Sequence, residues 1–154
     1  MKKLYFYILT FFFLSSCNSI IKTVYDDTSA RYNAYFLANE EIKSIENDYG
    51  KELNKSYDSL IDLTYKIDTN SISGIKDRSE SSIKKLSILI QRQSTSKYVY
   101  PSYALIGKSR LLNLDIKESI TTLKYVNSKS NNKEANTMAL VYLLRAYTEN
   151  KDYK

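Results

Sequence analysis

The sequence predicts an all-α protein built from antiparallel helical hairpins. Apolar residues recur at helical spacing through most of the chain after residue 28. Residues that start and stop helices separate these stretches. Strand-like alternation bounded by turn dipeptides is missing from the sequence. These three observations favour helices stacked side by side over any sheet.

The first residues have the pattern of an export signal. Met1–Lys3 is positively charged, the eleven residues Leu4–Leu14 are mostly apolar, and Ser15 and Ser16 are small. Eleven helical residues reach roughly 16 Å, about half of a bilayer core, so this segment is too short to stay as a span. We expect residues 1–16 to be a signal peptide that is cut between Ser16 and Cys17.

Cys17 is the only cysteine of the chain. The run Leu14-Ser15-Ser16-Cys17 resembles the lipobox of bacterial lipoproteins, which implies a diacylglycerol on the sulfur and a fatty acyl chain, such as palmitate, on the new amine. The alternative is an ordinary secreted protein with a chance cysteine, but a lone exported thiol would be open to oxidation. Residues 17–27, which have no periodic pattern, are then a lipidated tether.

A helical region is expected over residues 28–94. Its first helix starts at Asp26–Thr28 and stops at Gly50. Tyr32, Tyr35, Phe36 and Asn39 share one face, which we interpret as core, with a partner-binding surface as the alternative. Ala30, Ala34 and Ala38 form a narrow stripe that would let another helix approach.

Two more helices are predicted in this region. The first covers 51–67 and has an apolar stripe of Leu53, Tyr57, Leu60, Ile61 and Thr64. A loop containing Gly74 follows over 68–77. The second helix begins in the serine-rich stretch after residue 78, and its buried face comprises Ile83, Leu86, Leu89 and Ile90.

Residues 95–154 have the most regular pattern. Pro101 suits the first turn of a helix that runs to Asn113. Asp115, with Glu118 three residues later, predicts a capping box and a helix whose inward residues are Ile116, Ile120, Leu123 and Val126. Asn131 or Asn132 opens a last helix, with a stripe of Leu140, Leu143, Leu144 and Tyr147.

This last region resembles the tetratricopeptide repeat. Gly107 takes the small site of the first helix, Ser119 takes that of the second, and Leu123 and Val126 lie behind it. Leu144 follows Gly107 by 144 − 107 = 37 residues, against a usual period of about 34. Arg110 and Leu114 depart from the aromatic residue and the turn glycine of the pattern. The second repeat stops early, so we expect a piece of a longer solenoid or a chain capped by a partner.

The residue types argue against catalysis. There is no histidine, the single thiol is expected to carry lipid, and the carboxylate pairs Asp26-Asp27 and Glu40-Glu41 are sequence neighbours that do not face each other on a helix. We interpret both pairs as charge at a helix start and on a solvated face. Asp58 and Asp62 are flanked by lysines, which favours ion pairing over metal binding. The sequence therefore predicts neither an enzyme nor a cofactor or metal.

Charge does not favour a nucleic-acid partner. The net charge of the chain is +6, and removing Lys2 and Lys3 with the signal leaves 6 − 2 = +4 on 154 − 16 = 138 residues. Export to the envelope separates the chain from nucleic acid, and we expect most of these lysines to form a solvated face. Tyr98, Tyr100 and Tyr103 are the candidate partner contacts, because tyrosine is enriched where a side chain is half buried and half exposed to a partner.

Three passages together resemble the N-terminal part of the SprE/PorW-type lipoproteins of gliding motility and type IX secretion in the Bacteroidetes. They are "TSARYNAYFLANEEI", "SSIKKLSILIQRQS" and "YALIGKSRLLNLDIKESITTLKYV". The resemblance implies a non-catalytic, tetratricopeptide-containing scaffold on the inner leaflet of the outer membrane, which links a secretion channel to its motor. The tether has no acidic run after Cys17, which favours a periplasm-facing protein.

Two other functions stay open. Surface lipoproteins that capture glycans are also tetratricopeptide-like, although they use exposed tryptophan and tyrosine, and this chain has no tryptophan. A generic outer-membrane assembly lipoprotein that shares only the repeats is the third hypothesis.

Overall fold

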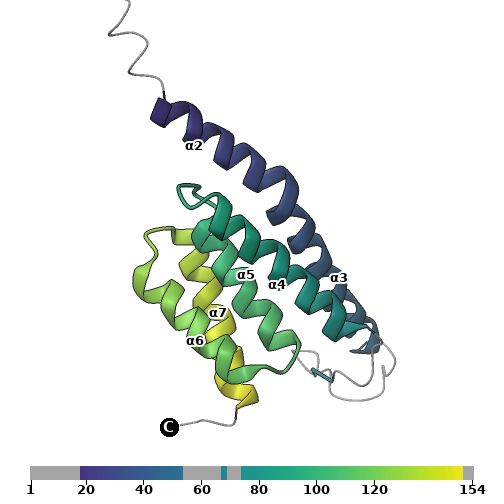
Figure 1. Ribbon diagram of the computed structural model, residues 1–154. Helices are drawn as coiled ribbons and strands as arrows, with labels where there is room; N and C mark the ends of the chain where they lie inside the picture. Colours follow the sequence, from purple (N-terminus) through teal and green to yellow (C-terminus); the bar gives the residue numbers. More distant parts are fainter. Residues whose placement is uncertain (1–17, 54–66, 69–73, 151–154) are drawn as a thin grey trace, which may run out of the picture.

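The computed structural model describes residues 18–53, 67–68 and 74–150 (Figure 1). Every regular element in these ranges is helical, which confirms the all-α prediction. The labels follow Figure 1: α2 (Asn18–Ser29), η1 (Ala30–Tyr35), α3 (Phe36–Leu53), α4 (Ile75–Arg92), α5 (Val99–Leu112), α6 (Ile116–Lys129) and α7 (Lys133–Glu149).

The helices pack in the order in which they occur. From α3 to α7 each helix lies against the next one, and α5 also contacts both α3 and α7. Such a chain of neighbours, with contacts between alternate helices, is consistent with a helical-repeat fold. α2, η1 and α3 form one continuous helical run, and α2 reaches past the other helices at one end of the bundle (Figure 1).

The N-terminal run differs from the sequence prediction at both ends. Residues 18–27, expected to be a tether without regular structure, belong to α2. Gly50 was expected to end a helix, yet α3 continues to Leu53. Among the described glycines only Gly74 has a positive φ, so Gly50 lacks the left-handed conformation with which glycine ends a helix. The helix expected over 51–67 lies, beyond Leu53, largely outside the described residues.

The aromatic stripe of this run is not core. Tyr32 is 65% exposed and Phe36 is 54% exposed, while Tyr35 and Asn39 are half-buried. The buried face consists instead of Ala30, Ala38, Ile42, Ile45 and Tyr49. As predicted, the alanine stripe lets another helix approach: Ala30 and Ala38 are buried, Ala34 is half-buried, and α4 packs against this run. η1 is a π-helix, whose i→i+5 spacing changes the phase of the turn. An α-helical period therefore selects the wrong face at this point.

α4 begins at Ile75, before the serine-rich start that the sequence predicts. Gly74 precedes it with φ of 75°, the left-handed conformation that glycine adopts without a Cβ penalty. Leu86 and Leu89 are buried, and Ile83 and Ile90 pack partly buried against the core, which confirms the predicted face.

α5 is the central helix, and ten of its fourteen residues are buried. Pro101 lies in its first turn, as predicted. At Gly107 a Cβ would lie 2.5 Å from Cγ and Cδ2 of Leu123 on α6. The hydroxyl of Ser119 donates to the carbonyl oxygen of Gly107 at 2.7 Å. The two helices therefore meet at a point where no side chain fits between them.

The start of α6 was placed correctly, but the capping box does not form. Asp115 is the N-cap and its side chain caps no backbone N–H; Oδ2 instead accepts from Nδ2 of Asn113 at 2.9 Å. Leu114 adopts φ of 64° where the repeat pattern has glycine. Leu123 and Val126 are buried, and Ile116 and Ile120 pack against the core, as predicted.

α7 begins after Asn132, whose Oδ1 accepts from the backbone N–H of Ala135 at 2.9 Å, so the predicted cap is confirmed. The predicted stripe is rotated. Leu143 is buried and Tyr147 is half-buried, but Leu140 and Leu144 are 54% and 70% exposed. Alanines form most of the actual core face, which comprises Ala135, Ala139, Leu143 and Ala146. In the part of the chain that the structure describes, no helix combines the length and the apolar character needed to cross a membrane.

The contact at Gly107 generates the first prediction. We expect Gly107→Ala to lower the free energy of unfolding by about 1–3 kcal/mol, because the added methyl group forces Leu123 or the α5–α6 distance to change. Gly50→Ala is the matched control: its Cβ enters open space inside a helix and should stabilise by about 0.5–1 kcal/mol. Urea unfolding followed by circular dichroism measures both. Equal shifts for the two variants would contradict the close approach.

Candidate functional site

The three candidate contact tyrosines are all half-buried and lie near the start of α5. The ring of Tyr98 packs on that of Tyr35, with centroids 5.0 Å apart. Tyr100 and Tyr103 both approach Tyr125 of α6, at 6.4 and 5.1 Å. Each ring therefore has one side in an aromatic contact and another side accessible, which is the geometry of a residue that can serve both packing and recognition.

Tyr98 belongs to a groove of about 320 Å³ between η1, the α4–α5 loop and the start of α7. Burial, followed by the negative charge of Glu134 and by Tyr98, raises the pKa of Tyr35 to about 12, so its hydroxyl stays protonated. The lining combines aromatic faces, two cations, one carboxylate and two amides: Arg31, Tyr35, Phe36, Asn39, Lys97, Tyr98, Pro101, Asn132 and Glu134. These groups suit contact with a polypeptide, because they offer apolar faces beside polar side chains.

A second, wider groove of about 640 Å³ lies between α2, the α4–α5 loop and the end of α6. Tyr100, Tyr103 and Tyr125 line it together with Thr23 and Asp27. The two grooves share Lys97 and Asn132. The predicted tyrosines therefore divide between two hollows at the same end of the bundle and do not form one patch.

Asp26 and Asp27 hold the α4–α5 loop beside α2. Thr95 Oγ1 donates to Asp26 Oδ2 at 2.7 Å, and the backbone N–H of Lys97 donates to Asp27 Oδ1 at 2.9 Å. Burial pulls the pKa of Asp27 upward, but hydrogen bonds from the Lys97 backbone and the Ser96 hydroxyl outweigh it and hold that pKa below its usual value. These acids were expected at a helix start; they lie inside the helical run and fix a loop.

Glu46, Lys108 and Tyr142 form a polar cluster that joins α3, α5 and α7. Lys108 Nζ lies 2.6 Å from Glu46 Oε2, and its side chain is only 8% exposed. Tyr142 donates its hydroxyl to Glu46 Oε1 at 3.0 Å, and the Lys108 ammonium lies 4.8 Å from the centre of the Tyr142 ring. A buried cation thus has an anion and an aromatic face as partners.

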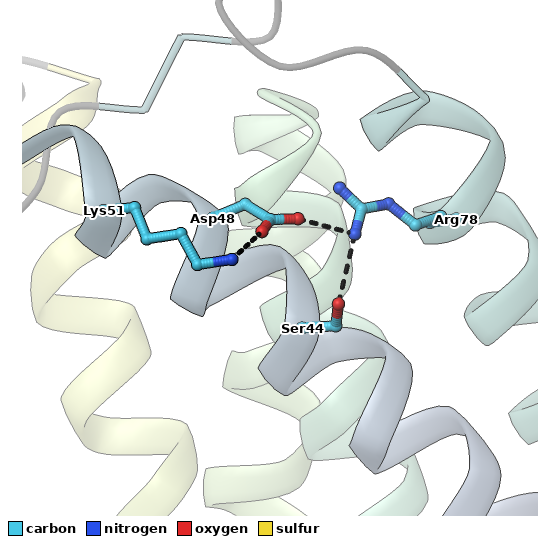
Figure 2. A network of polar contacts seen from close by, with 4 residues as sticks. All are labelled: Ser44, Asp48, Lys51 and Arg78. Carbon is cyan, nitrogen blue, oxygen red and sulfur yellow. Dashed lines mark hydrogen bonds and ion pairs between the residues drawn. The ribbon is translucent and has the colours of Figure 1, made fainter.

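α3 and α4 are joined by a second ionic contact, which Figure 2 shows from close by. Arg78 Nη1 donates to Asp48 Oδ2 at 2.8 Å and to Ser44 Oγ at 3.3 Å, and Lys51 Nζ reaches Asp48 Oδ1 at 3.1 Å. The hydrogen bonds from Arg78 and Lys51 lower the pKa of Asp48 below its usual value.

The second carboxylate pair also has structural partners. Glu41 accepts from Ser82 Oγ at 2.9 Å and from Lys85 Nζ at 2.6 Å, which ties α3 to α4. Glu40 pairs with Lys43 at the surface. Among the described residues no three acidic, histidine or cysteine side chains gather as a metal site. Ser16, Cys17, Asp58 and Asp62 lie outside these residues.

The predicted repeat positions have two different environments. Gly107, Ser119, Leu123 and Val126 are buried where α5 meets α6. Leu144, expected at the place equivalent to Gly107, is 70% exposed because the core side of α7 is formed by its alanines. It therefore does not pack as expected.

The Glu46–Lys108 pair and the loop held by Asp26 and Asp27 are not predicted by the sequence pattern. One signal for the first was available: Lys108 interrupts the apolar run "YALIGKSRLL", and a lysine there needs a buried anion. The partner lies 62 residues away, so its identity required the fold.

Comparison with protein-family models, curated proteins and solved structures finds no match to this chain.

The buried ion pair generates a stability prediction. Glu46→Met leaves the Lys108 ammonium buried without its anion and should lower the free energy of unfolding by about 3 kcal/mol, near the low end for buried pairs because Glu46 is 22% exposed. The double variant Glu46→Met/Lys108→Met should recover most of the loss. Urea unfolding measures both variants. A double variant that is less stable than Glu46→Met would contradict this account.

The Asp48–Arg78 contact generates a pH prediction. The folded-state pKa of Asp48 lies below the usual 3.8, so its stabilising effect is complete above that value and is lost as the pH falls through the folded-state pKa. The difference in urea midpoint between the parent and Asp48→Asn should therefore be present at neutral pH and shrink below pH 3.8. Glu40→Gln, in an exposed pair, is the control and should change the midpoint little at any pH. A gap for Asp48→Asn that grows on acidification would contradict the assignment.

Proposed function

We propose that this chain is a lipid-anchored adaptor of the bacterial outer membrane, which holds components of the type IX secretion and gliding machinery together through helix-to-helix contacts. Lipid on Cys17 fixes one end of the chain, and the helical bundle offers its faces to other envelope proteins from the periplasmic side. Tethering raises the local concentration of both partners, so individually weak contacts suffice.

One observation carries this proposal: α7 has a second apolar face that the bundle does not cover. Leu140, Val141 and Leu144 are 54%, 58% and 70% exposed. They follow helical spacing and lie on the side of α7 away from its buried alanines. Three large aliphatic side chains on one exposed helix face are typical of a surface that another helix covers.

The bundle itself indicates how such a helix would bind. α5 is covered on both sides, because α6 packs against Gly107 while α4 packs on another face. α7 contacts α5 and α6 on its alanine side. An amphipathic helix of another envelope protein, with Leu or Val along one face, would give α7 the two-sided burial that α5 has.

Deletion and complementation in a gliding, type IX-secreting host test the proposal. We expect the deletion strain to lose colony spreading and secretion, and the parent gene to restore both. Leu144→Glu should fail to restore them, because it places a charge in the apolar contact, while Thr121→Glu, at an exposed position of α6, should restore them.

Circular dichroism of the two variants should match the parent, since Leu144 is 70% exposed and contributes little to the core. Normal spreading and secretion in the deletion strain would refute the adaptor role. Full complementation by Leu144→Glu would refute the α7 face as the contact surface. The adaptor role would then be tested with substitutions in the two tyrosine grooves.

A further inference from the structure

The outer side of the continuous helical run formed by α2, η1 and α3 changes character along its length. From residue 21 to residue 37 it exposes large apolar side chains, each between 53% and 69% exposed: Ile21, Val24, Tyr25, Tyr32, Phe36 and Leu37. From residue 40 onward the exposed side chains are polar: Glu40, Lys43, Ser44, Asn47 and Lys51. The outer side of this helical run is thus apolar in its first half and polar in its second half. The polar half is the surface expected of a helix that faces water.

The apolar half has no role in the core of the bundle. The inward side of the same segment is formed by Asp26, which contacts the α4–α5 loop, and by the buried Ala30. Ile21, Val24, Tyr25 and Tyr32 follow one another at helical spacing on the opposite side. We call this set of four residues the α2 outer face.

The charges of this segment are divided between its two sides. Lys22 and Arg31 are exposed, and the Arg31 guanidinium lies 5.3 Å from the centre of the Tyr32 ring. The acidic residues between 21 and 39 are Asp26 and Asp27, and both are turned to the α4–α5 loop. The α2 outer face, which ends at Tyr32, is therefore apolar, and the charged side chains exposed along it are the cations Lys22 and Arg31. The exposed carboxylate of Glu40 lies two turns further along the run.

We propose that the α2 outer face lies on the phospholipid surface, so that the bundle is held against the membrane by a helix in addition to the lipid. This inference rests on the proposed anchor at Cys17. Ile21 follows Cys17 by four residues, at most about 14 Å of chain, so the start of the face is close to the membrane once Cys17 is acylated.

The composition fits this occupant better than a protein. Tyrosine is enriched at the membrane–water interface, and lysine and arginine place their charges among phosphate headgroups while their stems lie on apolar groups. A second copy packed on the same face would bring Lys22 and Arg31 of two chains near each other, and no exposed carboxylate between 21 and 32 would offset them. Phospholipid supplies the missing negative charge.

Depth measurements on labelled variants of the full chain test the proposal. The protein is produced in a Gram-negative host that processes lipoproteins and is reconstituted into vesicles of phosphatidylethanolamine and phosphatidylglycerol. Val24→Cys and Tyr32→Cys carry a nitroxide label on the face, and Lys43→Cys and Asn47→Cys carry it on the polar half of the same helical run. Collisions with oxygen, which concentrates in lipid, and with a nickel chelate, which stays in water, are measured for each label.

We expect labels at positions 24 and 32 to collide more with oxygen than with the chelate, and labels at 43 and 47 to show the reverse. The proposal would be overturned if labels at positions 24 and 32 collided with the chelate as often as labels at 43 and 47. Positions 24 and 32 that are shielded from both reagents would also overturn it, in favour of a second copy or another protein on this face.

Mass spectrometry of the same sample separates this result from the proposed anchor. An acylated Cys17 takes no label, so each variant then has a single labelled site. An unacylated Cys17 would show that the anchor is wrong. The signal of a chain labelled at Cys17 alone is then subtracted, and the contrast between positions 24 and 32 and positions 43 and 47 still decides whether the face meets lipid.

Discussion

The contact between Gly107 of α5 and Leu123 of α6 is the constraint on which the bundle depends most. Leu123 occupies the space where a larger residue at 107 would place its first carbon, and Ser119 ties its hydroxyl to the Gly107 carbonyl beside it. The contact between the α5 backbone at Gly107 and the Leu123 side chain thereby fixes the distance between α5 and α6. Since α5 also lies against α3, α4 and α7, its position sets the place of the four helices α3, α4, α6 and α7.

Polar groups then fix how the helices are aligned along their length. Apolar packing between alanine and leucine faces tolerates small sliding movements, because its energy depends mainly on area. The Glu46–Lys108–Tyr142 cluster, the Arg78–Asp48 contact and the Asp26 and Asp27 contacts with the α4–α5 loop each require particular atoms to meet. They contribute specificity to an arrangement whose stability comes from buried apolar surface. Asp26 and Asp27, one of the two carboxylate pairs considered as catalytic candidates, contribute to this alignment.

The local sequence pattern predicted the helical class and only part of the helix starts, since α2 and α4 begin earlier than expected. The helical class, the starts at Asp115 and Asn132 and the buried faces of α4 and α6 could be predicted, because each depends on residues within a few turns. The outward position of Tyr32, Phe36 and Leu144 could not. Which of two apolar faces is buried depends on how closely a neighbouring helix approaches. Here the buried faces are the ones that contain small alanines: Ala30 and Ala38 in the N-terminal run, and Ala135, Ala139 and Ala146 in α7. The grooves beside Tyr98 and Tyr103 join residues far apart in sequence and required the fold.

The π-helical winding of η1 decides how the segment before it is turned relative to the bundle. A π-helical turn takes up one more residue than an α-helical turn for nearly the same rotation. If all six residues of η1 wound as ordinary α-helix, at 3.6 residues per turn, everything before them would swing by about 100° around the helix axis relative to the bundle. Asp26 and Asp27 would leave the α4–α5 loop, and the greasy side of the first turns would point elsewhere. The π-helical winding of this six-residue segment therefore sets the angle at which the proposed membrane end of the molecule is presented.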